Sequence, residues 1–533
     1  MITDATDIEA ATGELCEYRE EISAVVGKQI EALATYAREL ERVRGHPGAT
    51  GSDALLIQHT LEAVDLARRR LRELPEIAMR GGPGVFSGLI QHAILAFRAS
   101  VAARTMLIRH TPTLMGFPHA LDPQQNHRLN PGDHIIDYAR NAYHQYQDSR
   151  SGSPRVLADN PVLRNAAESI AAILYEHPGV TKPILFSSAT GAIDSLIDYI
   201  VLLSRETGQQ FMIGQRCWFE IGQYARERYP GEYHTVDEHD TQAILDAIED
   251  PRISALVLEP LGNHPDMPVL DLERIAAKLS DTRFERPKIL VLDTVHTPDL
   301  DIFARYFPDG MPGNLCVALV ISGVKFLQAG WDISKSGLVA LYYNEGEMSP
   351  LGQSIHEKLI DIRSVAGRAP SIEEAYLADM ETAASFRSRL LRYDRNTRFF
   401  AEALDQWLRL YDLGHVTSPW LPGNDRHALA MSGCGTGGRI LFVNFNPRYF
   451  DEALLGEMYR LLAYRAEQES VSLMAAPSFG LAVPHVHVVI RPGLATTLRI
   501  STGSTSRQDV ERLLELVCAF LLEYRIDRGS LSL

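Results

Sequence analysis

The first residue whose position suggests chemistry is Lys325, which follows the apolar run 317–321 after a short Ser-Gly-Val link. The run predicts a buried strand, so the lysine would lie in a cleft where the loss of water lowers its pKa. A lysine in such a place can form an imine with a carbonyl compound. On this stretch alone, a surface lysine at the start of a loop is the favoured interpretation.

A second apolar run, 183–186, leads into Ser188, Ala189 and Thr190, where a helix is predicted to begin. Small residues with free backbone amides at the start of a helix form a cradle for an anion such as phosphate. An ordinary helix cap by Ser188 explains the same residues about equally well.

Two further apolar runs are each followed by a carboxylate. Run 255–258 is followed by Glu259 and then Asn263, and run 289–292 is followed directly by Asp293. A carboxylate at the end of an apolar strand needs a partner, such as a ring nitrogen that must stay protonated. A helix cap or an ion pair would also explain Asp293.

Together, these residues place an anion cradle, an asparagine, an aspartate and a lysine after four strands of one α/β domain. The ligand site of such a sheet lies beyond the carboxyl ends of its strands. The set suits pyridoxal 5′-phosphate (PLP), a phosphorylated aldehyde with a basic ring nitrogen. The phosphate would bind at the Ser188 turn, Lys325 would form the imine, and Asp293 would hold the ring nitrogen.

Residues from about 135 to 530 resemble, by their ordered motifs, the PLP enzymes of cysteine and methionine metabolism. That family includes cystathionine γ-synthase, cystathionine γ-lyase and methionine γ-lyase, and has the aspartate aminotransferase fold (fold type I). The matching motifs are 148–154 (DSRSGSP), 188–192 (SATGA), 259–264 (EPLGNH), 293–298 (DTVHTP), 322–326 (SGVKF) and 498–503 (LRISTG). Each motif alone is weak, but six of them in the family's order make the assignment strong.

The resemblance implies a role for each matching residue. Asn263 would bond the phenolic oxygen of the cofactor, and Arg499, assisted by Ser478, would clamp the substrate α-carboxylate. Arg150 would reach the phosphate bound by a neighbouring subunit, which implies a homodimer or homotetramer with shared active sites. The cofactor-binding residues implied in this way are Ser188, Ala189, Thr190, Asn263, Asp293, His296, Ser322, Lys325 and Arg150.

Several positions depart from the family pattern. Asp148 stands where a tyrosine binds the phosphate, and Tyr146 is the candidate to replace that tyrosine. Where another family tyrosine stacks on the cofactor ring, Trp218 or Phe219 could stack instead, although neither has a phenol that donates a proton. Both also suit the core face of a helix. The residues expected to line the site beside the reacting substrate therefore differ from those of an ordinary transsulfuration enzyme.

The resulting hypothesis is a PLP-dependent lyase or transferase that acts on a small-molecule amino acid. Lys325 would remove the Cα proton, after which a β or γ substituent leaves or is replaced. The favoured reaction is γ-elimination on an unusual γ-substituted amino acid, with halogenated amino acids among the candidates. The alternatives are aminotransfer or retro-aldol cleavage on the same fold, and a degenerate PLP fold that serves as a non-catalytic scaffold.

Composition argues against other classes of function. The formal net charge of −16 disfavours binding to nucleic acid or to anionic membranes. The five cysteines are widely spread and form no Cys/His cluster, which predicts no metal site and reduced thiols in a cytoplasmic protein. The acidic N-terminal residues predict no signal peptide, and no apolar run approaches the length of a membrane span.

The order of predicted elements gives an α/β fold class. A chain of 533 residues is too long for one core. We predict a helical extension over 1–115, a large PLP-binding α/β domain with a mostly parallel, seven-stranded type of sheet over 116–385, and a smaller α/β domain over 386–533. Strands of the large domain are predicted at 183–186, 211–213, 255–258, 289–292, 317–321 and 337–342.

Overall fold

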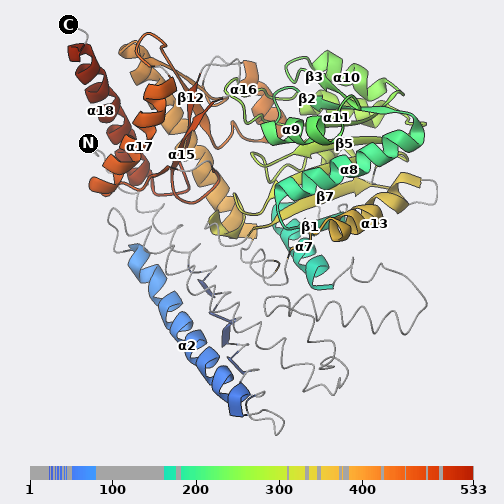
Figure 1. Cartoon of the computed structure of the whole chain (residues 1–533), viewed down its shortest axis with the longest axis horizontal. Helices are drawn as coiled ribbons and strands as arrows, with labels where there is room; N and C mark the ends of the chain where they lie inside the picture. Colours follow the sequence, from blue (N-terminus) through green and yellow to red (C-terminus); the bar gives the residue numbers. More distant parts are fainter. Residues whose placement is uncertain are drawn as a thin grey trace.

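The structure is a computed structural model with a seven-stranded sheet, a five-stranded sheet and the helices that cover them (Figure 1). It describes residues 51–79, 161–175, 182–308, 311–330, 335–344, 350–370, 375, 383–421, 425–450, 452–475, 478–490 and 496–531, and scattered positions between 23 and 44.

The large sheet has the strand order β1-β7-β6-β5-β4-β2-β3. Strand β7 runs antiparallel to β1 and β6, and the other neighbours are parallel. The strands are Lys182–Phe186 (β1), Gln210–Gly214 (β2), Tyr233–Val236 (β3), Ile253–Leu258 (β4), Lys288–Asp293 (β5), Leu315–Ser322 (β6) and Gly337–Tyr343 (β7). Every residue of β4, β5 and β6 is buried, as expected for parallel strands covered on both faces.

Helices cover both faces of this sheet. One face packs against α8 (Ala189–Thr207), α9 (Phe219–Arg228) and α13 (Pro350–Val365). The other packs against α7 (Pro161–Leu174), α10 (Thr241–Glu249), α11 (Leu272–Asp281) and α12 (Ile302–Tyr306). Side chains of β6 alternate between the two cores, with Val317 and Leu319 in one and Ala318 and Val320 in the other.

The small sheet has the order β10-β11-β12-β9-β8. Its strands are Gly414–Thr417 (β8), Leu441–Phe445 (β9), Met474–Ala475 (β10), His485–Val489 (β11) and Thr497–Ser501 (β12). Helices α15 (Ala383–Leu410), α17 (Glu452–Gln468) and α18 (Arg507–Leu531) pack on it.

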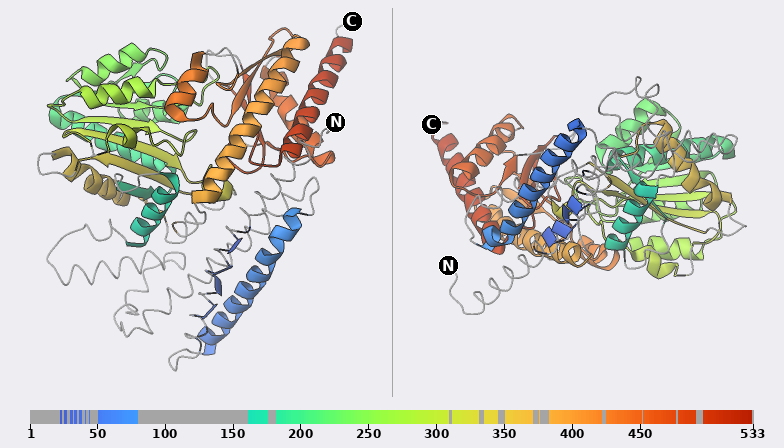
Figure 2. Two further views of the ribbon diagram at one scale, coloured as in Figure 1. Left: turned by 180° about the vertical axis from the view of Figure 1, so that it is seen from behind. Right: turned by 90° about the horizontal axis from the view of Figure 1, so that it is seen from below.

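Helix α15 contributes to both parts of the molecule (Figure 2). Its first half places Phe386 and Tyr393 in the core of the large sheet. Its second half places Phe400 and Leu408 in the core of the small sheet. The two sheets are therefore joined by a continuous helix as well as by loops.

The predicted fold class is confirmed, and each predicted strand of the large sheet is present. The sequence pattern does not predict β3 and β8, because these short edge strands carry exposed residues that interrupt the apolar run. The domain bounds stay a prediction. Of the predicted helical extension, the structure describes α2 (Gly51–Met79). None of the helices in the described ranges combines the length and apolarity that crossing a membrane requires.

Candidate active site

Lys325 and Asp293 lie at the same edge of the large sheet. Asp293 is the last residue of β5 and pairs in register with Val320 of β6, and Lys325 follows β6 in the next turn. Burial lowers the pKa of Lys325 to about 8, and the negative charge of Asp293 opposes this shift. Burial raises the pKa of Asp293, and the charge of Lys325 opposes that shift in turn. The half-buried lysine and the buried carboxylate are therefore close enough for each charge to affect the pKa of the other group.

A phenylalanine from the segment between β10 and β11 lies among these charged groups. The ring centroid of Phe479 is 4.0 Å from Lys325 Nζ and 5.0 Å from Arg499 Cζ. The ring also stacks on His296, with centroids 4.4 Å apart and planes within 5° of parallel. A second aromatic ring is near the same amine, since the Trp218 ring centroid is 5.7 Å from Lys325 Nζ. Residues from both parts of the chain thus converge on Lys325.

Arg499 and Asn263, which are far apart in sequence, are hydrogen-bonded partners. Arg499 is a buried residue of β12, and its Nη1 donates to Asn263 Oδ1 at 3.1 Å. The two residues predicted to bind the substrate carboxylate and the cofactor phenolic oxygen are therefore adjacent. Predicted Ser478 is half-buried and precedes Phe479 in the chain.

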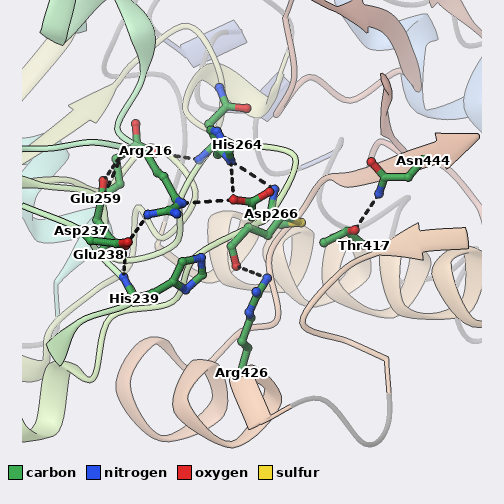
Figure 3. Close-up of polar contacts among 12 residues, drawn as sticks. Arg216, Asp237, Glu238, His239, Glu259, His264, Asp266, Thr417, Arg426 and Asn444 are labelled. Atoms are coloured by element: carbon green, nitrogen blue, oxygen red, sulfur yellow. Dashed lines mark hydrogen bonds and ion pairs between the residues drawn. The ribbon is translucent and has the colours of Figure 1, made fainter. Parts of the chain in front are cut away.

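A charged network fixes the loop that carries Asn263 (Figure 3). Arg216 Nε donates to Asp266 Oδ2 at 3.1 Å, and the same guanidinium pairs with Asp237. His264 Nδ1 accepts from the Asp266 backbone N–H at 3.2 Å. These contacts tie the loop after β4 to the loops after β2 and β3, so the position of Asn263 is set by neighbouring strands.

Glu259 is a buried carboxylate for which the sequence predicts no role. Its oxygens accept from the backbone N–H groups of Trp218 and Asn263, each at 2.7 Å. Burial, followed by the negative charge of Asp293, raises the pKa of Glu259 to about 8. The sequence feature that could have indicated a role for Glu259 is its position directly after the apolar residues of β4. The corresponding position in β5 indicated Asp293.

This raised pKa predicts a pH-dependent stability of the cofactor-free protein. Because the unfolded carboxyl ionises near its usual value of 4.5, the stabilisation from the folded protonated form is lost progressively as pH rises toward about 8. We expect Glu259→Gln to lose less stability between pH 5 and pH 8 than the unaltered protein, measured by thermal unfolding. An equal loss of stability in both proteins would contradict the raised pKa of Glu259. Any hydrogen bond lost in Glu259→Gln would lower the stability at pH 5 and at pH 8 alike, so it does not alter this comparison.

The Ser188 turn forms the predicted helix start. Ser188 caps α8, its Oγ accepting from the Gly191 N–H at 2.9 Å. Gly337 pairs in register with Ser322 on β6, and it also contacts the backbone of the Ser188 turn. The structure thereby brings Ser188 and Ser322 to one place, with the amide end of a helix. Thr190 is exposed and its hydroxyl donates to Glu220 at 3.4 Å.

Gly337 gives a direct test of this contact. A Cβ at Gly337 would lie 2.3 Å from the carbonyl carbon of Ser188, closer than packed atoms tolerate. We expect Gly337→Ala to destabilise the protein by about 1–3 kcal/mol in thermal or denaturant unfolding. Gly222→Ala in α9 is the matched control, because a Cβ there meets nothing within 4 Å and alanine favours a helix. Equal effects of the two changes would contradict the close approach.

Not every predicted residue reaches the site. Phe219 is 50% exposed and contacts Trp218, with centroids 4.6 Å apart and planes tilted by 53°, so Trp218 is the aromatic residue that faces Lys325. Arg150 and Tyr146 lie outside the described residues, and their roles stay predictions. Phe479 was missed as a residue that contacts Lys325; the available signal was its place directly after Ser478, but its residue type is that of an ordinary core residue.

No family model matches the chain. Among solved structures, metB from Corynebacterium glutamicum has a TM-score of 0.53 and 19% identity, covering 70% of this chain and 88% of that one. Cystathionine γ-synthase from Xanthomonas oryzae pv. oryzae has a TM-score of 0.52 and 17% identity, covering 69% and 87%. The methionine γ-lyase CalE6 from Micromonospora echinospora has a TM-score of 0.51 and 18% identity, covering 70% and 90%.

The chain has the fold of these enzymes. The resemblance predicted from the motifs is confirmed for the fold. A curated relative, the bifunctional enzyme flvA of Aspergillus flavus, is 22% identical over 377 residues, which is 68% of this chain. The chain spans 42% of the length of that relative, so the match concerns less than half of it.

The residues gathered at the site fit PLP by the chemistry of their donor groups. Asp293 offers a buried carboxylate for a ring cation, and the Ser188 turn offers hydroxyl and amide groups for a phosphate. His296 is buried, and neither of its ring nitrogens has a hydrogen-bond partner among the described residues. Burial and the charges of Lys325, Arg499 and Arg439 hold the pKa of His296 well below its usual value, so a neutral imidazole faces the site.

Proposed function

We propose that this protein is a PLP-dependent enzyme that eliminates or replaces a substituent at Cβ or Cγ of an amino acid. The observation that carries the proposal is that Lys325, Asp293 and Asn263 lie at or after the carboxyl ends of neighbouring strands of the large sheet and that Arg499 contacts Asn263 and the Phe479 ring beside Lys325. The shared fold with proteins named cystathionine γ-synthase and methionine γ-lyase supports the reaction class. We favour γ-elimination from a γ-substituted amino acid, with halide among the leaving groups to be tested.

The residues at the strand ends would hold the cofactor. Asp293 would pair with the ring nitrogen, the Ser188 turn with Ser322 would bind the phosphate, and Trp218 would cover a face of the ring. When bound, PLP withdraws electrons from the Cα of an amino acid attached to it. Glu259 would act indirectly, because it positions the backbones of Trp218 and Asn263.

The substrate would be oriented by Arg499 and deprotonated by Lys325. A guanidinium offers two parallel N–H donors to a carboxylate, which fixes the direction of the Cα–H bond. With its pKa lowered to about 8, the Lys325 amine is partly unprotonated near neutral pH and can accept that proton. Trp218 supplies no phenol, so the proposal assigns to Lys325 the return of protons to the product as well.

The reaction is tested by offering a panel of γ-substituted amino acids to the PLP-loaded protein. We expect ammonia, a 2-oxo acid and the released γ substituent in equal amounts when γ-elimination occurs. Formation of a 2-oxo acid without ammonia would instead indicate aminotransfer, and an aldehyde product would indicate retro-aldol cleavage. A purified protein that neither binds PLP nor releases a product would favour a scaffold role and contradict the proposal.

Assembly as a homodimer or homotetramer, with Arg150 shared between subunits, belongs to the same proposal. Its support is the motif 148–154, which lies outside the described residues. A cytoplasmic location likewise stays a prediction.

A further inference from the structure

A cavity of about 530 Å³ lies between α12, α15 and the π-helical turn Ala430–Cys434, and none of the proposed active-site residues lines it. Its volume falls in the range of small-molecule sites. Part of its wall is apolar and is formed by Leu174, Leu300, Ile302, Leu390, Leu391 and Met431. Leu391 is 63% exposed, so its side chain is accessible to a ligand in the cavity.

Charges of both signs line the same cavity. Asp299, Asp301 and Asp394 contribute carboxylates, and the exposed side chains of Arg305 and Arg387 contribute guanidinium groups. Asp301 accepts a hydrogen bond from the Tyr342 hydroxyl at 2.8 Å. Asp394 already forms an ion pair within the protein, because Arg439 Nε lies 3.1 Å from its Oδ1. Asp299 lies 3.4 Å from Arg439 Nη1, but its side chain is 36% exposed, so its carboxylate remains accessible to a ligand. Arg305 and Arg387 make no ion pair with other described residues.

The arrangement of these groups indicates the chemistry of an occupant. Arg387, Leu391 and Asp394 follow one another at helical spacing along one face of α15. A ligand with an ammonium group at Asp299 and a carboxylate at Arg305 or Arg387 would lay its stem on the apolar wall. The π-helical turn is an independent pointer, because such single turns are rare and occur frequently at functional sites.

Arg439 connects this cavity with the candidate active site. It is 1% exposed, and its Nη1 donates to the His296 backbone carbonyl at 3.0 Å while it also pairs with Asp299 and Asp394. His296 lies three residues after Asp293 in the same segment. Two carboxylates of the cavity, Asp299 and Asp394, and the loop that follows β5 are therefore held by the same guanidinium.

We propose that this cavity is a second binding site, which takes a small zwitterion whose ammonium and carboxylate are separated by an apolar stem. The probe for its test is 5-aminopentanoate, compared with pentanoate and pentylamine, which each carry one of the two charges. In titration calorimetry with the full chain, we expect 5-aminopentanoate to bind at least about tenfold more tightly than either single-charge compound, since each lost charged contact weakens binding to that degree.

Two variants locate the binding. Asp299→Asn and Arg387→Gln should each weaken 5-aminopentanoate binding about tenfold, whereas Asp281→Asn and Arg226→Gln, on exposed faces of α11 and α9, should leave it unchanged. Both altered side chains are at least partly exposed, and thermal unfolding checks that each variant is folded; if one is not, the other decides.

Three results with the probe, its analogues and the two variants would overturn the proposal, and a fourth would come from the active site. They are no detectable binding of 5-aminopentanoate, equal binding of the single-charge compounds, and unchanged binding in both variants. Weakened binding in Arg499→Lys would also overturn it, because the probe would then occupy the active site. The test needs no bound PLP, so its outcome is independent of the proposed function.

Discussion

Replacement of Lys325 with alanine should abolish the visible absorbance band of the lysine-bound cofactor and lower turnover by about 10³-fold or more. The size follows because the change removes the group that would be linked to PLP together with the base that would take the Cα proton, and such proton transfers alone contribute about 10²- to 10⁴-fold. The measurements are an absorbance spectrum of the protein after incubation with PLP and an assay of released ammonia.

Lys335→Ala is the matched control for this change. Lys335 is exposed in the structure and lies ten positions further along the chain. It should leave both the absorbance band and the turnover unchanged. If Lys325→Ala keeps its band and its activity, Lys325 is not the attachment residue, and the proposed role of the lysine is wrong.

Replacement of Arg499 with lysine should raise the KM for the amino-acid substrate by about 10- to 100-fold, with a smaller change in kcat. Lysine keeps the positive charge but cannot offer two parallel N–H donors, and a charged hydrogen bond contributes about 1.5–3 kcal/mol. The guanidinium also donates to Asn263, so its loss removes a contact inside the site as well. Steady-state kinetics with the preferred substrate measure the effect.

The absorbance band separates this effect from a failure to bind PLP. Arg499→Lys should retain the band, because the proposed cofactor contacts lie on other residues. Arg507→Lys is the matched control, since Arg507 begins α18 and pairs there with Glu511 on the surface. An unchanged KM in Arg499→Lys would show that the substrate carboxylate binds elsewhere.

The sequence determined the large sheet and the residues at its carboxyl edge. Strands β4, β5 and β6 are uninterrupted apolar runs, because both of their faces are covered by helices. Once the strands are parallel, the residues that follow them must meet at one edge, which is why Asp293 and Lys325 could be selected together. The N-cap at Ser188 is a local property of a few residues, and it too could be predicted.

Only the tertiary structure showed that Phe479 contacts Lys325. The family motif indicated Arg499 as a site residue, but the approach of Phe479 and Arg499 to Lys325 arises from packing between segments remote in sequence, and no periodicity in the chain encodes it. The same packing decided between Trp218 and Phe219, since both are large aromatic residues at the start of α9 and only their orientation distinguishes them. The raised pKa of Glu259 likewise arises from burial beside Asp293, on the neighbouring strand. Local sequence sets the ends of strands, whereas distances between groups on different segments depend on how the whole chain packs.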